Sequence, residues 1–229
     1  MDISISMELK TAAPNLCLGC VTASVKIRKT NDDLWAVIDK HIQYLTSTMR
    51  LESLGSIQQI SVMKDAYKNL GKDPSRYRGS AEALLRRVLS GKGIYKINTV
   101  VDINNLVSLK TFHPVGSYDL EKIKAPLAFR AGRPGESYKG IGKEVINIER
   151  LPVFADAEGA YGSPTSDSER AMIRMETSKA MLVIISFNGR TQMEEQMSEA
   201  ADLLQRYSGA SDVSCTIVHE STIAISPEM

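Results

Sequence analysis

One short apolar run limits the folds open to this chain more than any other feature. Residues 181–187 read MLVIISF, apolar at almost every position and rich in β-branched side chains. A strand with one wet face alternates apolar and polar residues, whereas a strand covered on both faces is apolar throughout. The run therefore predicts a strand that is buried on both faces, and it is far shorter than the ~20 residues needed to cross a bilayer.

Helical and strand patterns alternate along the rest of the 229 residues. Period-two and β-rich segments predict strands at 3–7, 19–27, 127–130, 145–148 and 153–156, and a hairpin-like segment at 213–225. Apolar stripes at helical spacing predict helices at 32–49, 56–70, 81–90, 97–109 and 191–208. Ser80 is expected to cap one helix and a Thr191–Glu194 capping box to open another, while 113–116 is expected to be a loop. Because no repeat or low-complexity linker occurs, we expect one domain over residues 1–229.

The composition excludes several classes of protein. Apolar residues make up 43%, charged residues 24%, and the formal net charge is +1, which excludes a collagen, a disordered tail and a histone-like protein. Three cysteines are too few for a secreted disulfide scaffold, and no apolar signal segment opens the chain, so we expect a cytoplasmic protein. Cys17 and Cys20 have no second pair and run into a predicted strand that starts at residue 19, which indicates two buried thiols. The histidines share no ligand spacing, so we expect no metal and no cofactor.

Polar residues within 77–119 form the first candidate site. Arg86 and Arg87 lie opposite the apolar stripe of their predicted helix, where they either meet RNA phosphates or belong to a solvated face. Asn98, Asn104 and Asn105 place amides where a helix favours Leu or Ala, since an amide competes with the backbone. These three residues either form the wall of a substrate-binding pocket or serve in caps and turns.

The second candidate site is the 162–168 loop, GSPTSDS, which precedes the apolar run. Its hydroxyls and its carboxylate can bind a ligand's amine or hydroxyl through hydrogen bonds. Gly162 and Ser163 are therefore substrate-binding candidates, and Thr165 and Asp167 are catalytic candidates, with Asp167 as the base. A turn that caps itself would use the same residues.

Four blocks of the sequence, in order, carry a resemblance to a known family. They are INTVVDINNLVSL at 97–109, P-x-G-x-Y-D at 114–119, LAFRAGRPGE at 127–136 and GSPTSDSER at 162–170. Together they resemble the B3/B4 domain of the phenylalanyl-tRNA synthetase beta subunit, in its stand-alone, single-domain form. The resemblance covers 75–185, and residues 1–70 match less clearly. It implies a mixed α/β (α+β) fold with a β-sandwich-like core flanked by helices, and an editing site that hydrolyses tRNA wrongly charged with tyrosine.

The departures from this family concern the reacting groups. The family's Thr-Asn pair falls on Asn104 and Asn105, so the Asn is kept and the Thr is replaced by a larger amide. Its pocket histidine falls on Gly116, and the run at 180–184 has no acid where the family has the glutamate that reads the tyrosine hydroxyl. A buried hydroxyl without a partner costs about 1–3 kcal/mol, so that contact no longer favours tyrosine.

Two functions follow from the resemblance. One is a freestanding aminoacyl-tRNA deacylase, a hydrolase that removes a wrong amino acid from tRNA in trans. The other is a non-catalytic module that binds an amino acid or RNA. Both have tRNA or an aminoacyl group as partner and neither involves DNA or a membrane. Without a recognisable ATP-binding synthetase core, the chain is not expected to aminoacylate tRNA on its own.

The near-zero net charge averages two unlike parts of the chain. Residues 1–148 carry 22 basic and 14 acidic side chains, and residues 149–229 carry 6 and 13. The basic excess is densest at 64–96, with nine basic residues against three acids. A basic face that meets an RNA backbone is therefore compatible with the composition, although solvated surface helices have the same charge count.

Overall fold

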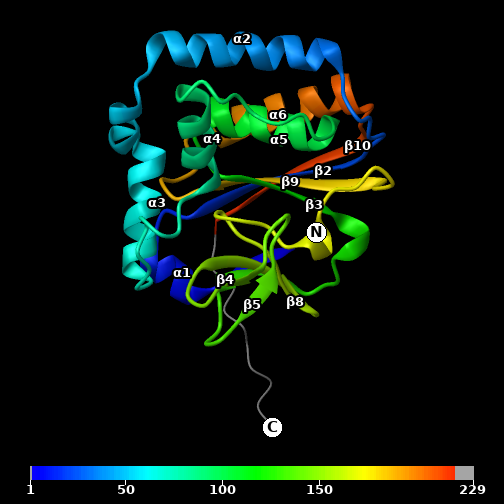
Figure 1. Ribbon diagram of the computed structural model, residues 1–229. Coiled ribbons are helices and arrows are strands. Elements are labelled where there is room, and N and C mark those ends of the chain that lie inside the picture. The colour runs from blue at the N-terminus through cyan, green and yellow to red at the C-terminus, as the bar shows by residue number, and fades with distance from the viewer. Residues whose placement is uncertain (1, 220–229) are drawn as a thin grey trace.

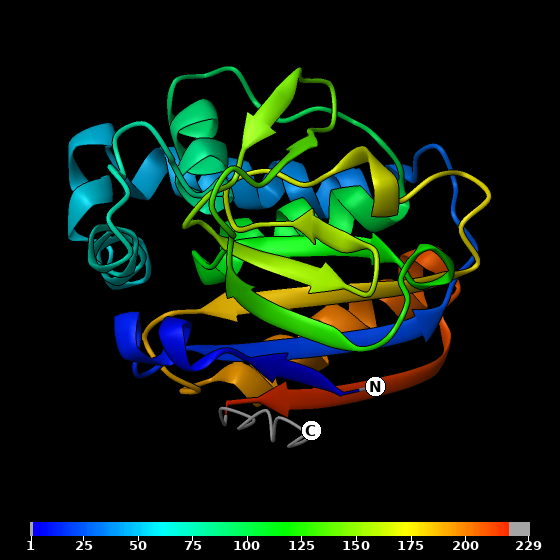
Figure 2. The ribbon, with the colours of Figure 1, turned by 90° about the horizontal axis from the view of Figure 1, so that it is seen from below.

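The apolar run forms the middle of a four-stranded antiparallel sheet. In the computed structural model, which describes residues 2–219, β9 (Lys179–Ser186) lies between β2 (Cys17–Ser24) and β3 (Val115–Asp119). β10 (Ser211–Val218) pairs with the other edge of β2, so the strand order is β10-β2-β9-β3. Figure 2 shows these strands side by side. The predicted buried strand is confirmed, because every residue from Ala180 to Ser186 is buried.

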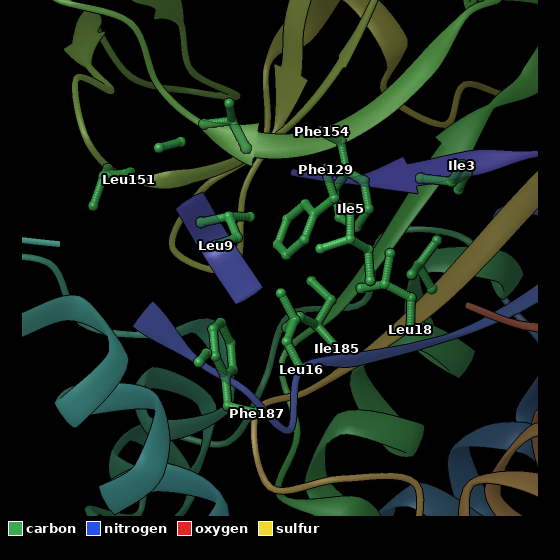
Figure 3. Close-up of a cluster of buried hydrophobic side chains, with 14 of the residues drawn as sticks. Ile3, Ile5, Leu9, Leu16, Leu18, Phe129, Leu151, Phe154, Ile185 and Phe187 are labelled. Carbon is green, nitrogen blue, oxygen red and sulfur yellow. The ribbon is translucent and has the colours of Figure 1, made fainter. Parts of the chain in front are cut away.

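A second four-stranded sheet packs on one face of the first. Its strands are β1 (Ile3–Ile5), β4 (Leu127–Ala131), β7 (Pro152–Asp156) and β8 (Gly159–Gly162), in that spatial order. β1 runs parallel to β4 and the other pairs are antiparallel. Figure 3 shows the apolar side chains that meet between the two sheets. The mixed α/β fold with a β-sandwich-like core is thus confirmed.

Helices cover the other face of the first sheet. α5 (Thr99–Thr111) and α6 (Met193–Ser208) pack on it, and α2 (Asp32–Thr48) lies over them, as Figure 1 shows. β9 serves both cores, because Leu182 and Ile184 face the helices while their neighbours face the sandwich. The remaining helices are α1 (Met7–Ala12), α3 (Gln58–Asn69) and α4 (Ser80–Leu89), with short 3-10 helices at Leu51–Ser56, Leu120–Lys122 and Glu169–Ala171.

A separate two-stranded hairpin projects from the sandwich. It consists of β5 (Ser137–Lys139) and β6 (Val145–Asn147), with the glycine-rich residues 140–144 between them. β10 accounts for the first part of the hairpin-like segment predicted at 213–225, and residues 220–225 lie outside the described part of the chain. Within the described residues, no helix has the length and apolar character needed to cross a membrane.

Two predicted helix caps are wrong. α4 has Gly79 at its N-cap, without a side-chain bond, and Ser80 is already the first helical residue. α6 follows Gln192, whose left-handed backbone (φ 62°) leaves no place for the Thr191–Glu194 capping box. In both cases a neighbouring residue occupies the N-cap position that was assigned to the preferred capping residue.

The two cysteines of the C-x-x-C are separate buried thiols, as predicted. Both are reduced and buried on β2, but Cys17 belongs to the core under the helices and Cys20 to the core of the sandwich. Burial raises the pKa of both thiols, which keeps them protonated and unreactive. Side chains three residues apart on a strand point to opposite faces, so the sheet lies between the two sulfurs.

Candidate functional site

The polar loop that follows β8 is a turn that caps itself. The Ser163 hydroxyl donates to the carbonyl of Ser166 at 2.7 Å. It also accepts from the N–H groups of Ser166 at 3.0 Å and Thr165 at 3.3 Å. These bonds are typical of Ser in tight turns. Ser163 was a candidate for substrate binding, with a turn that caps itself as the alternative. In the structure its side chain shapes the loop.

Three tyrosine hydroxyls from three different elements hold the same loop. Tyr67 of α3 shares a 2.8 Å hydrogen bond with Thr165 Oγ1, and Tyr118 of β3 donates to Asp167 Oδ1 at 2.8 Å. Tyr138 of β5 donates to the loop carbonyl of Ser166. Burial raises the pKa of each of these phenols, so they remain protonated donors. The loop therefore has a fixed shape, set by contacts that are distant in the sequence.

Asp167 is the one loop side chain that keeps an unused hydrogen-bonding atom. Its Oδ1 accepts from Tyr118 and from the N–H of Ser163 at 3.1 Å. Its Oδ2 has no protein partner among residues 2–219. Desolvation raises the pKa of this carboxyl to about 6, although both hydrogen bonds act to lower it. A carboxyl with such a pKa can exchange a proton close to neutral pH.

Two glycines make room for Tyr118 beside this carboxyl. A Cβ atom at Gly116 would lie 2.7 Å from Tyr118 Cζ, and one at Gly162 would lie 2.6 Å from the same atom. Gly116 pairs with Val183 inside β3, so the prediction of a loop at 113–116 is wrong for its last two residues. A glycine inside a strand commonly marks such a close approach, and that signal was available in the sequence. Gly162 thus has a packing role.

The asparagines of α5 are not part of the loop site. Asn98 is the N-cap of α5, because its Oδ1 accepts from the N–H of Val101 at 3.0 Å. Asn104 is only 8% exposed, and its amide donates to Asn105 at 3.4 Å while its own Oδ1 is buried without a partner. α5 packs on the helix-covered face of the sheet, and the loop lies on the sandwich face. The structure therefore does not bring 104 and 105 together with 163, 165 and 167.

Arg86 and Arg87 lie on α4, which begins at the loop. The N–H of Ser80 donates to the carbonyl of Pro164 at 2.8 Å, and this bond joins the start of α4 to the loop. The Nε atom of Arg86 lies 2.8 Å from Oε1 of Glu82. This buried carboxylate is also paired with Lys64 of α3. Arg87 instead lies 4.0 Å above the ring of Tyr95. The two arginines thus differ, since Arg86 has its charge paired and Arg87 supports an aromatic ring.

Comparisons with known proteins agree on one family. A model described as the B3/4 domain matches residues 62–214. The phenylalanine–tRNA ligase beta subunit of Bartonella quintana is 32% identical over 82 residues, which is 35% of this chain and 10% of that protein. Its counterpart in Geobacter metallireducens is 30% identical over 113 residues, 48% of this chain and 14% of that protein. The chain thus spans a small fraction of these relatives.

A solved structure also aligns with the chain. It is an N-terminal fragment of the phenylalanyl-tRNA synthetase beta subunit from Pyrococcus horikoshii, with a TM-score of 0.45 and 13% sequence identity. The alignment covers 95% of this chain and 50% of that one. The strands β1 and β2, which precede the residues matched by the family model, pair with β4 and β9 inside the matched region.

Proposed function

Because the chain belongs to the B3/4 domain family, we propose that it is a freestanding deacylase that hydrolyses the ester of a wrongly attached amino acid on tRNA. Its curated relatives are beta subunits of a ligase that acts on tRNA. The observation that carries the proposal is the Asp167 carboxyl, whose Oδ1 is held by Tyr118 and Ser163, whose Oδ2 has no partner among residues 2–219, and whose pKa is raised to about 6. This function places the protein in the cytoplasm, with no membrane or DNA partner.

The proposed reaction uses the free oxygen of Asp167 as a general base. A water bound at Oδ2 gives its proton to the carboxylate while its oxygen attacks the ester carbonyl carbon. The bond from that carbon to the ribose oxygen then breaks, and the ribose oxygen takes up the proton. The products are the free amino acid and uncharged tRNA. Above pH 6 the carboxyl is largely ionised, as a base must be, and such a base contributes about 10²- to 10⁴-fold to rate.

Thr165 supplies the other part of the proposed site. Its side chain is half-buried, and its hydroxyl is fixed by Tyr67 at 2.8 Å. A hydroxyl held in this way can bind the amine or the carbonyl of an aminoacyl group without first losing rotational freedom. Ser163 acts indirectly, since its bonds keep the loop in the shape that presents Thr165 and Asp167 together.

A panel of mischarged tRNAs tests this function. We expect at least one to lose its amino acid faster than the spontaneous rate with micromolar protein. Asp167→Asn should lower that rate by about 100-fold or more. Glu195→Gln, the same carboxylate-to-amide change on the exposed start of α6, is the matched control and should leave the rate unchanged. If no member of the panel is hydrolysed, or if Asp167→Asn retains full activity, the deacylase proposal is refuted.

A non-catalytic module that binds an amino acid or RNA is the second candidate, and one observation favours it. Tyr118 fills the space next to Gly116, the position where the family resemblance places a pocket histidine. A thermal shift series with the twenty amino acids and a tRNA mobility shift at two salt concentrations separate the candidates. Binding that weakens with salt but gives no turnover supports the second function.

A further inference from the structure

The segment that joins α4 to α5 is basic and lies on the surface. From residue 83 to residue 101 the chain contains four basic residues and no acid. Lys92, Tyr95 and Lys96 are all exposed in this segment, which crosses the helical layer in Figure 1. Tyr95 is 66% exposed, so packing in the core does not explain this large aromatic residue.

Arg87 holds Tyr95 in place from one side. The guanidinium of Arg87 lies 4.0 Å from the centre of its ring, and the same guanidinium donates to the carbonyl of Lys92 at 3.4 Å. A cation over one face of a tyrosine ring fixes the ring without covering the other face. The exposure of Tyr95 leaves that second face open to solvent. An open aromatic face beside lysines is the arrangement on which proteins stack unpaired bases.

Further positive charge lies at the start of α5. Arg28 and Lys29 are exposed, and the backbone of Arg28 exchanges hydrogen bonds with Thr99 at 3.0 and 3.2 Å. The start of α5 thus brings a second basic segment beside the first. Lys96 contacts Trp35, whose ring centre lies 4.6 Å from the Lys96 ammonium. Aspartates 32 and 33 of this region occupy the first turn of α2, where an acid stabilises the helix end. Asp102 is buried, and its carboxylate accepts hydrogen bonds from the indole N–H of Trp35 at 2.8 Å and the backbone N–H of Ile97 at 3.0 Å.

α4 connects this surface to the 162–168 loop. Its first residue, Ser80, is bonded to Pro164, and its ten residues span about 15 Å at 1.5 Å per residue. A stacked strand advances about 3.4 Å per nucleotide, so the length of α4 corresponds to about four nucleotides. Lys64, Arg78 and Arg86 surround the single carboxylate of Glu82 along this path, which leaves an excess of positive charge.

We propose that Tyr95, Arg87, Lys92 and Lys96 form a binding site for unpaired RNA, with a base stacked on Tyr95 and phosphates on the two lysines. A strand bound there reaches the 162–168 loop with an end about four nucleotides away. The placement of the strand's end at the loop rests on the proposed deacylase function. The binding site around Tyr95 does not. An acidic protein would engage the lysines but would leave the tyrosine face unused, so the aromatic ring favours RNA.

Fluorescence anisotropy with an unpaired oligoribonucleotide of twelve residues tests the site. Tyr95→Ala should weaken binding by about 5- to 150-fold, because one stacked base is worth about 1–3 kcal/mol. Tyr95→Phe keeps the ring and should bind within about twofold of the wild type. Tyr44→Ala is the matched control, since Tyr44 is an equally exposed tyrosine (60%) on α2, outside the site. Lys92→Ala should reduce the salt slope of log Kd by about 0.7.

Three results would overturn the proposal: no binding by the wild type at low salt, equal binding by Tyr95→Ala, or equal affinity for a blunt duplex or a poly-glutamate peptide. The last would show that charge alone is recognised. Since Tyr95 is exposed, unchanged thermal unfolding of its variants verifies that they are folded. If RNA binds as expected but no mischarged tRNA is hydrolysed, the binding site stands and only the deacylase function and the strand orientation fail.

Discussion

Replacing Asp167 with asparagine should stabilise the protein relative to the wild type increasingly as the pH rises from 4.5 to 7.5. The folded-state pKa of Asp167 is about 6, whereas an unfolded aspartate has a pKa of ~3.9. Between these values the folded protein holds a proton that the unfolded chain has released. The contribution of Asp167 to stability is therefore full below pH 4 and is lost as the pH rises through 6.

The size of the effect follows from the two pKa values. Integrated from pH 4.5 to 7.5, the loss of stability due to Asp167 is about 2 kcal/mol. The asparagine variant keeps an oxygen for Tyr118 and for the N–H of Ser163 but does not titrate, so it escapes this loss. The wild-type profile alone is not diagnostic. Burial lowers the pKa of His113 to about 4, so this histidine makes the protein more stable as the pH rises over the same range.

The measurement is therefore a difference. Urea unfolding of the wild type and of Asp167→Asn at pH 4.5, 5.5, 6.5 and 7.5 cancels the His113 contribution, which both proteins share. We expect the variant to gain about 2 kcal/mol over the wild type across the range. Glu195→Gln, on the exposed start of α6, is the matched carboxylate-to-amide control. A flat or falling difference for Asp167→Asn would show that its carboxyl is not desolvated and would remove the physical basis for its role as a base.

Three further changes test the packing around the loop. Gly116→His should lower the free energy of unfolding by about 1–3 kcal/mol, because its side chain overlaps Tyr118, and Tyr118→Ala should cost less in this variant than in the wild type; equal thermal stability of the first variant would contradict this. Thr165→Val should lower the free energy of unfolding, measured with urea, by about 1–3 kcal/mol, because it leaves the buried hydroxyl of Tyr67 unpaired. Combining it with Tyr67→Phe should recover most of that loss. Glu82→Gln should cost about 1.5–3 kcal/mol, since a buried carboxylate with cationic partners is lost; an unchanged urea midpoint would show that these pairs contribute nothing.

Local patterns in the sequence were sufficient for most of the elements but not for their ends. The buried strand β9 and the helix α2 follow from residue periodicity. Asn98 was open to two interpretations, a pocket wall or a cap, and the capping role is the one observed. Gln192 shows the limit, because nothing near it in the sequence indicates its left-handed backbone.

The candidate site was predictable in residue type but not in geometry. Asp167 and Thr165 stood out as polar residues in a turn-rich loop, and both remain the residues on which the proposed chemistry rests. Their tyrosine partners lie 49 and 98 residues away along the chain, on β3 and α3. No local pattern encodes such contacts. The same holds for Asn104, whose distance from the loop is set by which face of the sheet α5 covers.

The position of β2 in the first sheet has a consequence for how the chain folds during synthesis. β2 is complete at residue 24, yet its two neighbours are β9, which ends at residue 186, and β10, which ends at residue 218. At ~5–20 residues per second, the ribosome needs roughly 8–32 s to make the chain between the end of β2 and the end of β9, the first of its two neighbours to be completed. Throughout that time β2 has no partner strand, and its apolar residues need protection from other chains. The sheet thus closes late, and folding should be slow and governed by pairing between distant parts of the chain.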